Sequence, residues 1–254
     1  MNDSEKIKNP RGTRWCGTGI ISAGTGVVLI IIALAGARAG VLPPLPAFGV
    51  FGIGMLALVV SIFVTIIGLI LSKGTGGATS AVRTWSALTV AVLAMAIIAS
   101  QQPESSGSSP IHDITTDIGN PPSFEAILPL RKDAPNPPEY AGKEAAEIQK
   151  AIYPDIVTLT VEKPTDEVFM AAEKVARDLG WEIVRADPDS GQIEATATTD
   201  WFRFKDDVVI RLTPRGTESY VDIRSKSRIG QGDMGANADR IKTFLTALSA
   251  ATDD

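Results

Sequence analysis

The stretch QIEATATTDWFRFKDDVVIRLTPRGTESYVDIRSKSRI, residues 192–229, decides how the second half of this chain folds. Apolar and polar residues alternate in three segments of it, and a period of two is typical of a half-buried β-strand. The turn residues Arg215 and Gly216 separate the last two segments, which predicts a hairpin. We therefore expect consecutive antiparallel strands with one polar and one apolar face.

Helical patterns lie on both sides of this stretch. The apolar spacing in residues 164–180 and 237–250 predicts two amphipathic helices, and Asn237 is a suitable cap for the second. Further expected elements are a short helix at 143–152 and strands at 155–162 and 181–188. The resulting order of strand, helix, four strands and helix predicts an α+β fold, an antiparallel sheet with helices packed on one face.

The first hundred residues hold nearly all of the long apolar runs. Three runs, 17–37, 48–72 and 84–100, contain no charged residue. Because about 20 apolar residues span the hydrocarbon core as a helix, residues 1–100 are predicted to form a membrane domain with three transmembrane helices. A cleaved signal peptide is the alternative for the first run, but its length and the two later runs favour a span. The absence of charge within the runs indicates an anchor rather than a transporter.

Charge is divided unevenly along the chain. Residues 1–110 contain seven Lys and Arg against three Asp and Glu, while residues 111–254 contain 17 against 26. Basic residues cluster before the first run and between the second and third, and such residues stay on the cytoplasmic side. We therefore expect a bacterial inner (cytoplasmic) membrane protein with a cytoplasmic N-terminus and a periplasmic or otherwise extracytoplasmic C-terminal domain. Nucleic acid is excluded as a partner, because it is held by clustered Lys and Arg.

A polar linker at 101–110 is expected to separate the membrane domain from a soluble domain, 111–254. Residues 111–142 contain six prolines, which rule out a long helix or a central strand. We expect this segment, called the arm below, to run extended over the folded domain. The chain has one Cys and one His, so it cannot form an internal disulfide or a multi-cysteine zinc site, and we expect neither a metal nor a cofactor.

Polar residues from neighbouring strands are predicted to share one face of the sheet. By the period of two, Glu194, Arg211, Asp222 and Arg224 lie together on the face opposite the apolar residues. Two interpretations remain open: a solvated face with weak ion pairs, or a polar groove that the arm covers and that binds a ligand.

The glycines at 230, 232 and 235 spell G-x-G-x-x-G before the last helix. A dinucleotide site needs this motif at the first turn of a parallel strand–helix–strand unit, and here no strand follows. The motif instead indicates a turn that needs positive φ, and we expect no nucleotide. The turn is expected to place Arg228 and Asp233 beside the arm, with Arg228 in contact with Asp113.

Three arginines near this turn, Arg224, Arg228 and Arg240, require anionic partners. If carboxylates do not supply them, an anionic ligand such as a lipid phosphate is the alternative. His112 and Asp113 are the candidates for catalysis, because a His with a carboxylate can act as a general base. The alternative for that segment is that its carboxylates and Thr116 cap a turn.

Several motifs of the second half resemble one family. They are PIHDITTD, GWEIV, IEATATTDWFRFKDDVVIR and VDIRSKSRIGQGDMGANADRI, which occur in this order from about Pro110 to the end. They resemble the family called domain of unknown function 1499. The resemblance implies a location in an envelope or organelle membrane and supplies no catalytic residues.

Two classes of function follow. The favoured one is a membrane-anchored binding or assembly module, whose sheet face and glycine turn contact an envelope protein or an anionic lipid. The alternative is a periplasmic hydrolase that uses His112 and nearby carboxylates. Whether the chain is an enzyme is left open, and the residues favour a module without catalysis.

Overall fold

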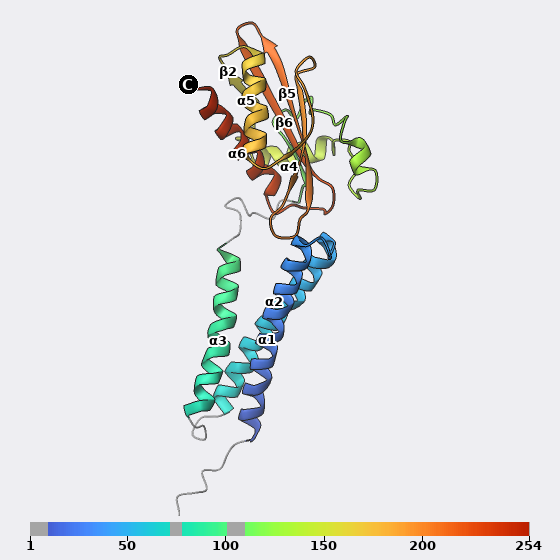
Figure 1. Ribbon diagram of the computed structural model, residues 1–254. Helices are drawn as coiled ribbons and strands as arrows, with labels where there is room; N and C mark the ends of the chain where they lie inside the picture. Colours follow the sequence, from blue (N-terminus) through green and yellow to red (C-terminus); the bar gives the residue numbers. More distant parts are fainter. Residues whose placement is uncertain (1–9, 72–77, 101–109, 254) are drawn as a thin grey trace, which may run out of the picture. The chain divides into compact units, whose positions relative to one another are not determined.

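The computed structural model describes residues 10–71, 78–100 and 110–253 of the chain (Figure 1). The chain divides into two compact units, one made of the N-terminal helices and one that contains the arm and the sheet. Apart from Pro110, the predicted linker lies outside the described residues.

Three helices form the N-terminal unit: α1 (Pro10–Arg38), α2 (Pro44–Leu71) and α3 (Ala78–Ala99). Glycines allow α1 and α2 to pack closely, because a Cβ added to Gly26 would lie 2.8 Å from the backbone oxygen of Gly54. The Ser61 hydroxyl donates a hydrogen bond to the Gly19 carbonyl at 2.9 Å across the same contact. The two helices therefore form a tight hairpin, and many of its large apolar side chains are exposed.

Two of the described helices are long and apolar enough to cross a membrane, Arg14–Arg38 within α1 and the whole of α2. In α3 the apolar segment found among the described residues is Leu88–Ala99, which is shorter than these two helices. The structure thus supports two candidate spans among the residues it describes, where the sequence predicted three.

An antiparallel sheet organises the second unit, as expected. Its strands are β1 (Asp113–Thr115), β2 (Leu159–Val161), β3 (Glu182–Asp187), β4 (Gln192–Thr198), β5 (Lys205–Arg215) and β6 (Glu218–Ser227). The strand order is β1-β6-β5-β4-β3. Strand β2 also pairs with β6, at a different part of that strand from β1. The hairpin of β5 and β6 turns at Gly216 and Thr217, one residue later than predicted, because Arg215 still pairs with Glu218. The long central strands arise from the alternating stretch.

Helices cover one face of this sheet (Figure 1). They are α4 (Lys143–Ile152), α5 (Thr165–Asp178) and α6 (Ala236–Thr252), close to the predicted positions. Apolar residues of α5 and α6 pack with the inward residues of the central strands, including Ile193, Ile210 and Ile223, which are 0 % exposed. Trp181 stacks on Phe244 with ring centroids 5.4 Å apart. The α+β fold with helices on one sheet face is therefore confirmed.

One strand was not predicted, and one local prediction is wrong. The arm contains β1, a strand of three residues that pairs with β6 at the sheet edge, where the prolines of the arm do not interfere. Asn237 does not cap α6, because the Asp233 carboxylate accepts hydrogen bonds from the backbone N–H groups of Gly235 at 2.9 Å and Asn237 at 2.8 Å. The Asn237 side chain instead bonds to Ser225 at 2.6 Å.

Candidate functional site

The arm lies on the sheet face opposite the α5 and α6 helices (Figure 1). The strand alternation places Glu194, Arg211, Asp222 and Arg224 on this face, as predicted, because their neighbours Ile193, Ile210 and Ile223 belong to the core. The face is mostly buried: Glu194 is 0 % exposed and Arg224 is 2 % exposed. It is therefore a contact between the arm and the sheet over most of its length, and not a solvated surface.

Glu194 holds the middle of the arm. Its carboxylate accepts hydrogen bonds from three consecutive backbone N–H groups of the arm, those of Glu125 at 3.0 Å, Ala126 at 2.8 Å and Ile127 at 3.0 Å. Beside it, Val209 packs with the buried arm residues Phe124 and Ile127. A buried carboxylate is tolerated here because donors from the arm replace its hydration.

Asp113 ties the start of the arm to β6. Its two carboxylate oxygens accept hydrogen bonds from Arg224 at 2.8 and 2.9 Å, and Lys226 donates to it at 3.0 Å. Burial lowers the pKa of the Lys226 ammonium from its ordinary value, and the charge of Asp113 opposes this shift. The Arg224 guanidinium also lies over the Phe124 ring, 4.8 Å from its centroid.

Asp207 forms a third buried contact between the arm and the sheet. The contacts of Glu194, Asp113 and Asp207 are called the buried joints below. It pairs with Arg131 of the arm at 2.9 Å and with Arg228 at 2.7 Å, and its side chain is 0 % exposed. The predicted contact between Arg228 and Asp113 is therefore wrong, because Asp207 on the neighbouring strand is the closer carboxylate and Asp113 is bound by β6. Burial lowers the pKa of the Arg131 guanidinium, and the charge of Asp207 opposes this effect.

The glycine turn lies next to these joints. Gly230 and Gly235 have φ values of 104° and 89°, so the predicted need for positive φ is confirmed at two of the three glycines. Arg240 does not join the arm, because it pairs with Asp206 at 2.7 Å on the helix side of the sheet. Burial raises the pKa of the Asp233 carboxyl, although two backbone hydrogen bonds favour its charged form. All three arginines near the turn thus have carboxylate partners.

His112 is close to the turn, as expected, but not to its neighbouring carboxylate. Its Nδ1 atom lies 3.0 Å from the backbone oxygen of Gln231, so this nitrogen carries the proton and orients the ring. Asp113 faces Arg224 and Lys226 instead. Asp117 caps a turn, as one interpretation predicted, because it accepts hydrogen bonds from the backbone N–H groups of Gly119 at 3.0 Å and Asn120 at 2.9 Å. The geometry does not assemble a His–Asp pair.

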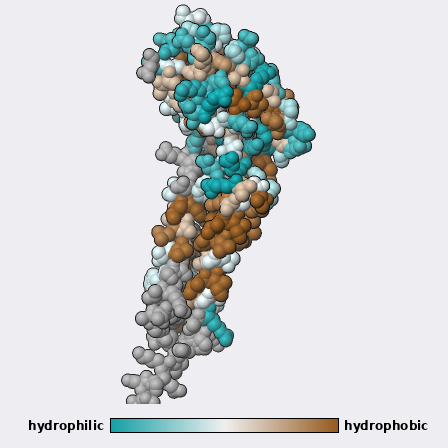
Figure 2. Space-filling view, in the orientation of Figure 1, coloured by the Kyte–Doolittle hydropathy of each residue, from teal (hydrophilic) through white to brown (hydrophobic). Residues whose placement is uncertain are grey.

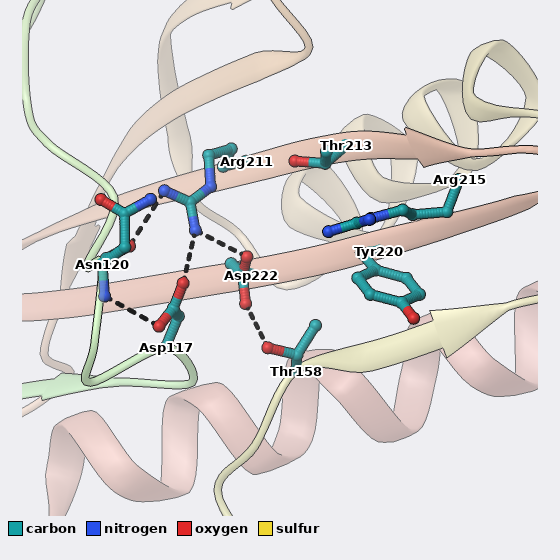
Figure 3. A pocket seen from close by; sticks show the side chains of 8 residues that line it. All are labelled: Asp117, Asn120, Thr158, Arg211, Thr213, Arg215, Tyr220 and Asp222. Atoms are coloured by element: carbon teal, nitrogen blue, oxygen red, sulfur yellow. Dashed lines mark hydrogen bonds and ion pairs between the residues drawn. The ribbon is translucent and has the colours of Figure 1, made fainter.

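The polar face opens into a pocket near the β5–β6 turn (Figure 3). The pocket has a volume of about 290 Å³, and its lining residues are Asp117, Asn120, Thr158, Arg211, Thr213, Arg215, Tyr220 and Asp222. Arg211 bridges Asp117 at 2.9 Å and Asp222 at 2.7 Å. Two members of the predicted binding set, Arg211 and Asp222, therefore lie in an accessible cavity.

The predicted binding set did not include the other residues of this pocket. Arg215 and Tyr220 were missed, although the period of two places Arg215 on the same face as Arg211, four residues before it. The sequence signal that could have identified both residues is the alternation of the two faces, which continues to the hairpin turn. Near that turn Thr213 pairs with Tyr220 in the strand register. Glu194, Arg224, Arg228, Asp233 and Arg240, the rest of the predicted set, do not line the pocket.

Comparison with known families supports the resemblance seen in the sequence. The model of the family described as "Protein of unknown function (DUF1499)" matches residues 113–248, more than half of the chain. The chain belongs to this family. The DUF1499 match begins at β1 and ends within α6, so it contains all but the first two residues of the arm, the buried joints and every residue of the pocket. A comparison with curated proteins finds no match.

The lining of the DUF1499 pocket consists of polar and charged side chains. In the part of the chain that the structure describes, no group of three or more His, Cys, Asp and Glu side chains is arranged to hold a metal ion. The pocket offers charged groups and hydroxyls held in place by neighbouring strands, which suits hydrogen bonding to a small polar ligand.

Proposed function

We propose that this DUF1499 protein is a membrane-anchored binding module whose ligand occupies the pocket between Arg211 and Arg215. The observation that carries the proposal is the pocket itself. It is the open end of a sheet face that is otherwise sealed by the arm, and Arg211 is fixed in it by two carboxylates. Side chains locked by their neighbours are suited to binding because little order must be gained when a ligand arrives.

The helical unit supports the anchor. Apolar surface is concentrated on the described helices, whereas the face of the sheet domain in the same view is mainly polar (Figure 2). We propose that α3 crosses the membrane together with α1 and α2, because residues 84–100 carry no charge and adjoin basic residues on one side only. Three crossings from a cytoplasmic N-terminus leave the DUF1499 domain outside the cytoplasm of a bacterial cell. Two crossings would leave it inside.

Protease accessibility tests this arrangement. Protease added to intact bacterial spheroplasts should release the domain by cutting the segment at 101–110, while a cytoplasmic marker protein stays intact. Cleavage that occurs only in inverted membrane vesicles would place the domain in the cytoplasm. That result would support two crossings and overturn the extracytoplasmic assignment.

A pocket-filling variant tests the binding function. Thr213→Trp places a large side chain in the pocket, and Thr217→Trp is a matched control at an exposed position of the same hairpin. Full-length protein should be extracted in mild detergent and examined by native mass spectrometry. We expect a bound species with the unmodified protein and with Thr217→Trp, and its loss with Thr213→Trp. A spectrum without any bound species, or with equal retention in both variants, would contradict binding in this pocket.

A further inference from the structure

Arg215 differs from the other arginines of the sheet. The described strands carry four arginines, and three of them pair with carboxylates: Arg185, Arg211 and Arg224. Among the described residues, no carboxylate pairs with Arg215. Its guanidinium therefore keeps its hydrogen-bond donors available in the pocket.

The position of this guanidinium is nevertheless defined. Its central carbon lies 5.3 Å from the centroid of the Tyr220 ring, and Figure 3 shows the side chain running along the strands toward Asp222. Glu218 lies opposite Arg215 in the strand register, yet the two do not form an ion pair. Stacking on Tyr220 thus directs the charge into the pocket instead of across the hairpin.

The pocket is electrically asymmetric. At one end Asp117 and Asp222 share the single charge of Arg211, which leaves one negative charge in excess. At the other end Arg215 contributes one positive charge. Thr213 lies between the two arginines on the same strand face and adds a hydroxyl. A ligand that fits both ends carries an oxyanion at one end and a hydrogen-bond donor at the other.

We infer that the ligand binds Arg215 through a phosphate or carboxylate group and presents an amine or hydroxyl group to Asp117 and Asp222. Arg binds both oxyanions with paired N–H groups, which gives orientation as well as affinity. Phosphoethanolamine has this distribution of charge, both as a soluble compound and as a phospholipid headgroup. The inference rests on the proposed binding function and narrows its ligand class.

Binding of soluble phosphoethanolamine to the full-length protein in detergent tests the inference by titration calorimetry. Arg215→Gln should weaken binding by roughly tenfold or more, since charge-assisted hydrogen bonds are lost. Glu218→Gln is the matched control, because it removes a neighbouring charge of opposite sign from the same hairpin. It should bind at least as tightly as the unmodified protein.

A second experiment distinguishes a soluble ligand from a lipid. Phospholipid retained after detergent exchange should be measured for the unmodified protein and for Arg215→Gln. Retention that depends on Arg215 would identify a lipid headgroup, and calorimetric binding alone would identify a soluble compound. If neither depends on Arg215, the inference is overturned. In that case the native mass spectra decide whether the proposed function also fails. A bound species that is lost with Thr213→Trp would still support binding in the pocket, whereas spectra without any bound species would contradict both the proposed function and this inference.

Discussion

Replacing Glu194 with Gln should release the middle of the arm without unfolding the domain. Glu194 is 0 % exposed and accepts three backbone N–H groups of the arm at 2.8 to 3.0 Å. A Gln side chain has one acceptor oxygen. In its best orientation this oxygen keeps the Glu125 and Ile127 donors, and the amide NH₂ group then faces the N–H group of Ala126.

The cost follows from that geometry. One buried N–H group loses its partner, at about 1–3 kcal/mol, and the two remaining hydrogen bonds lose their charge assistance. We expect the free energy required to open this part of the arm to fall by about 2–4 kcal/mol. Because about 1.4 kcal/mol corresponds to a factor of ten, hydrogen exchange of the arm should accelerate by roughly 30- to 1000-fold.

Hydrogen–deuterium exchange with mass spectrometry measures this directly on the full-length protein. Peptides that cover residues 123–131 should lose protection in Glu194→Gln, while peptides from α5 should keep theirs. The control is Glu182→Gln, which changes an exposed Glu on the neighbouring strand β3. Unchanged exchange of the arm would refute the reasoning. Equal loss of protection in the arm and in α5 would also refute it, because Glu194 would then support the whole domain.

Three further predictions concern stability. Asp207→Asn should destabilise the domain by about 3–5 kcal/mol in chemical denaturation, because it leaves the buried Arg131 and the partly buried Arg228 without their carboxylate. A loss below about 1 kcal/mol would contradict this. Burial raises the pKa of the Asp233 carboxyl above its ordinary value of 3.8, so ionising this group opposes folding. Asp233→Asn should therefore gain stability relative to the unmodified protein as the pH rises above 3.8, and a pH-independent difference in melting temperature would contradict the shift. Gly191→Ala should destabilise the domain more than Gly216→Ala. Both glycines have positive φ, but only at Gly191 would an added Cβ lie 2.5 Å from the Leu212 backbone oxygen. Equal melting temperatures of the two variants would contradict this prediction.

The sequence predicted most of this domain because its periods are strong. The alternation in β4, β5 and β6 correctly assigned residues to the two faces, and helix positions followed from apolar spacing and from stop signals such as Gly180. The strand β1 was missed because three residues at the start of a proline-rich arm carry no readable period. Its pairing with β6 depends on a distant part of the chain.

The partners of the arginines could not be predicted for a related reason. Arg228 binds Asp207 because the register of β5 against β6 brings Asp206 opposite Ser227, and that register is not visible in the composition of either strand. The pocket was predicted only in part. Arg211 and Asp222 were identified, but Arg215 was not, because nothing in the sequence shows where the arm stops covering the sheet.

We propose that one polar sheet face has two roles, a buried joint under the arm and a binding end that the arm leaves open. Arg224 and Arg215 represent these two parts on adjacent strands. Arg224 makes two bonds to Asp113 and is 2 % exposed, while Arg215 is exposed and pairs with no carboxylate among the described residues.

The most direct test compares the melting temperatures of Arg224→Gln and Arg215→Gln in the full-length protein without added ligand. Breaking the buried pair should cost about 3–5 kcal/mol, which corresponds to a decrease of about 6–20 °C for Arg224→Gln. Arg215→Gln should melt within about 2 °C of the unmodified protein, because a change at an exposed side chain costs less than about 0.5 kcal/mol. Equal decreases for the two variants, or no decrease for Arg224→Gln, would contradict the division of the sheet face into a joint and a binding site.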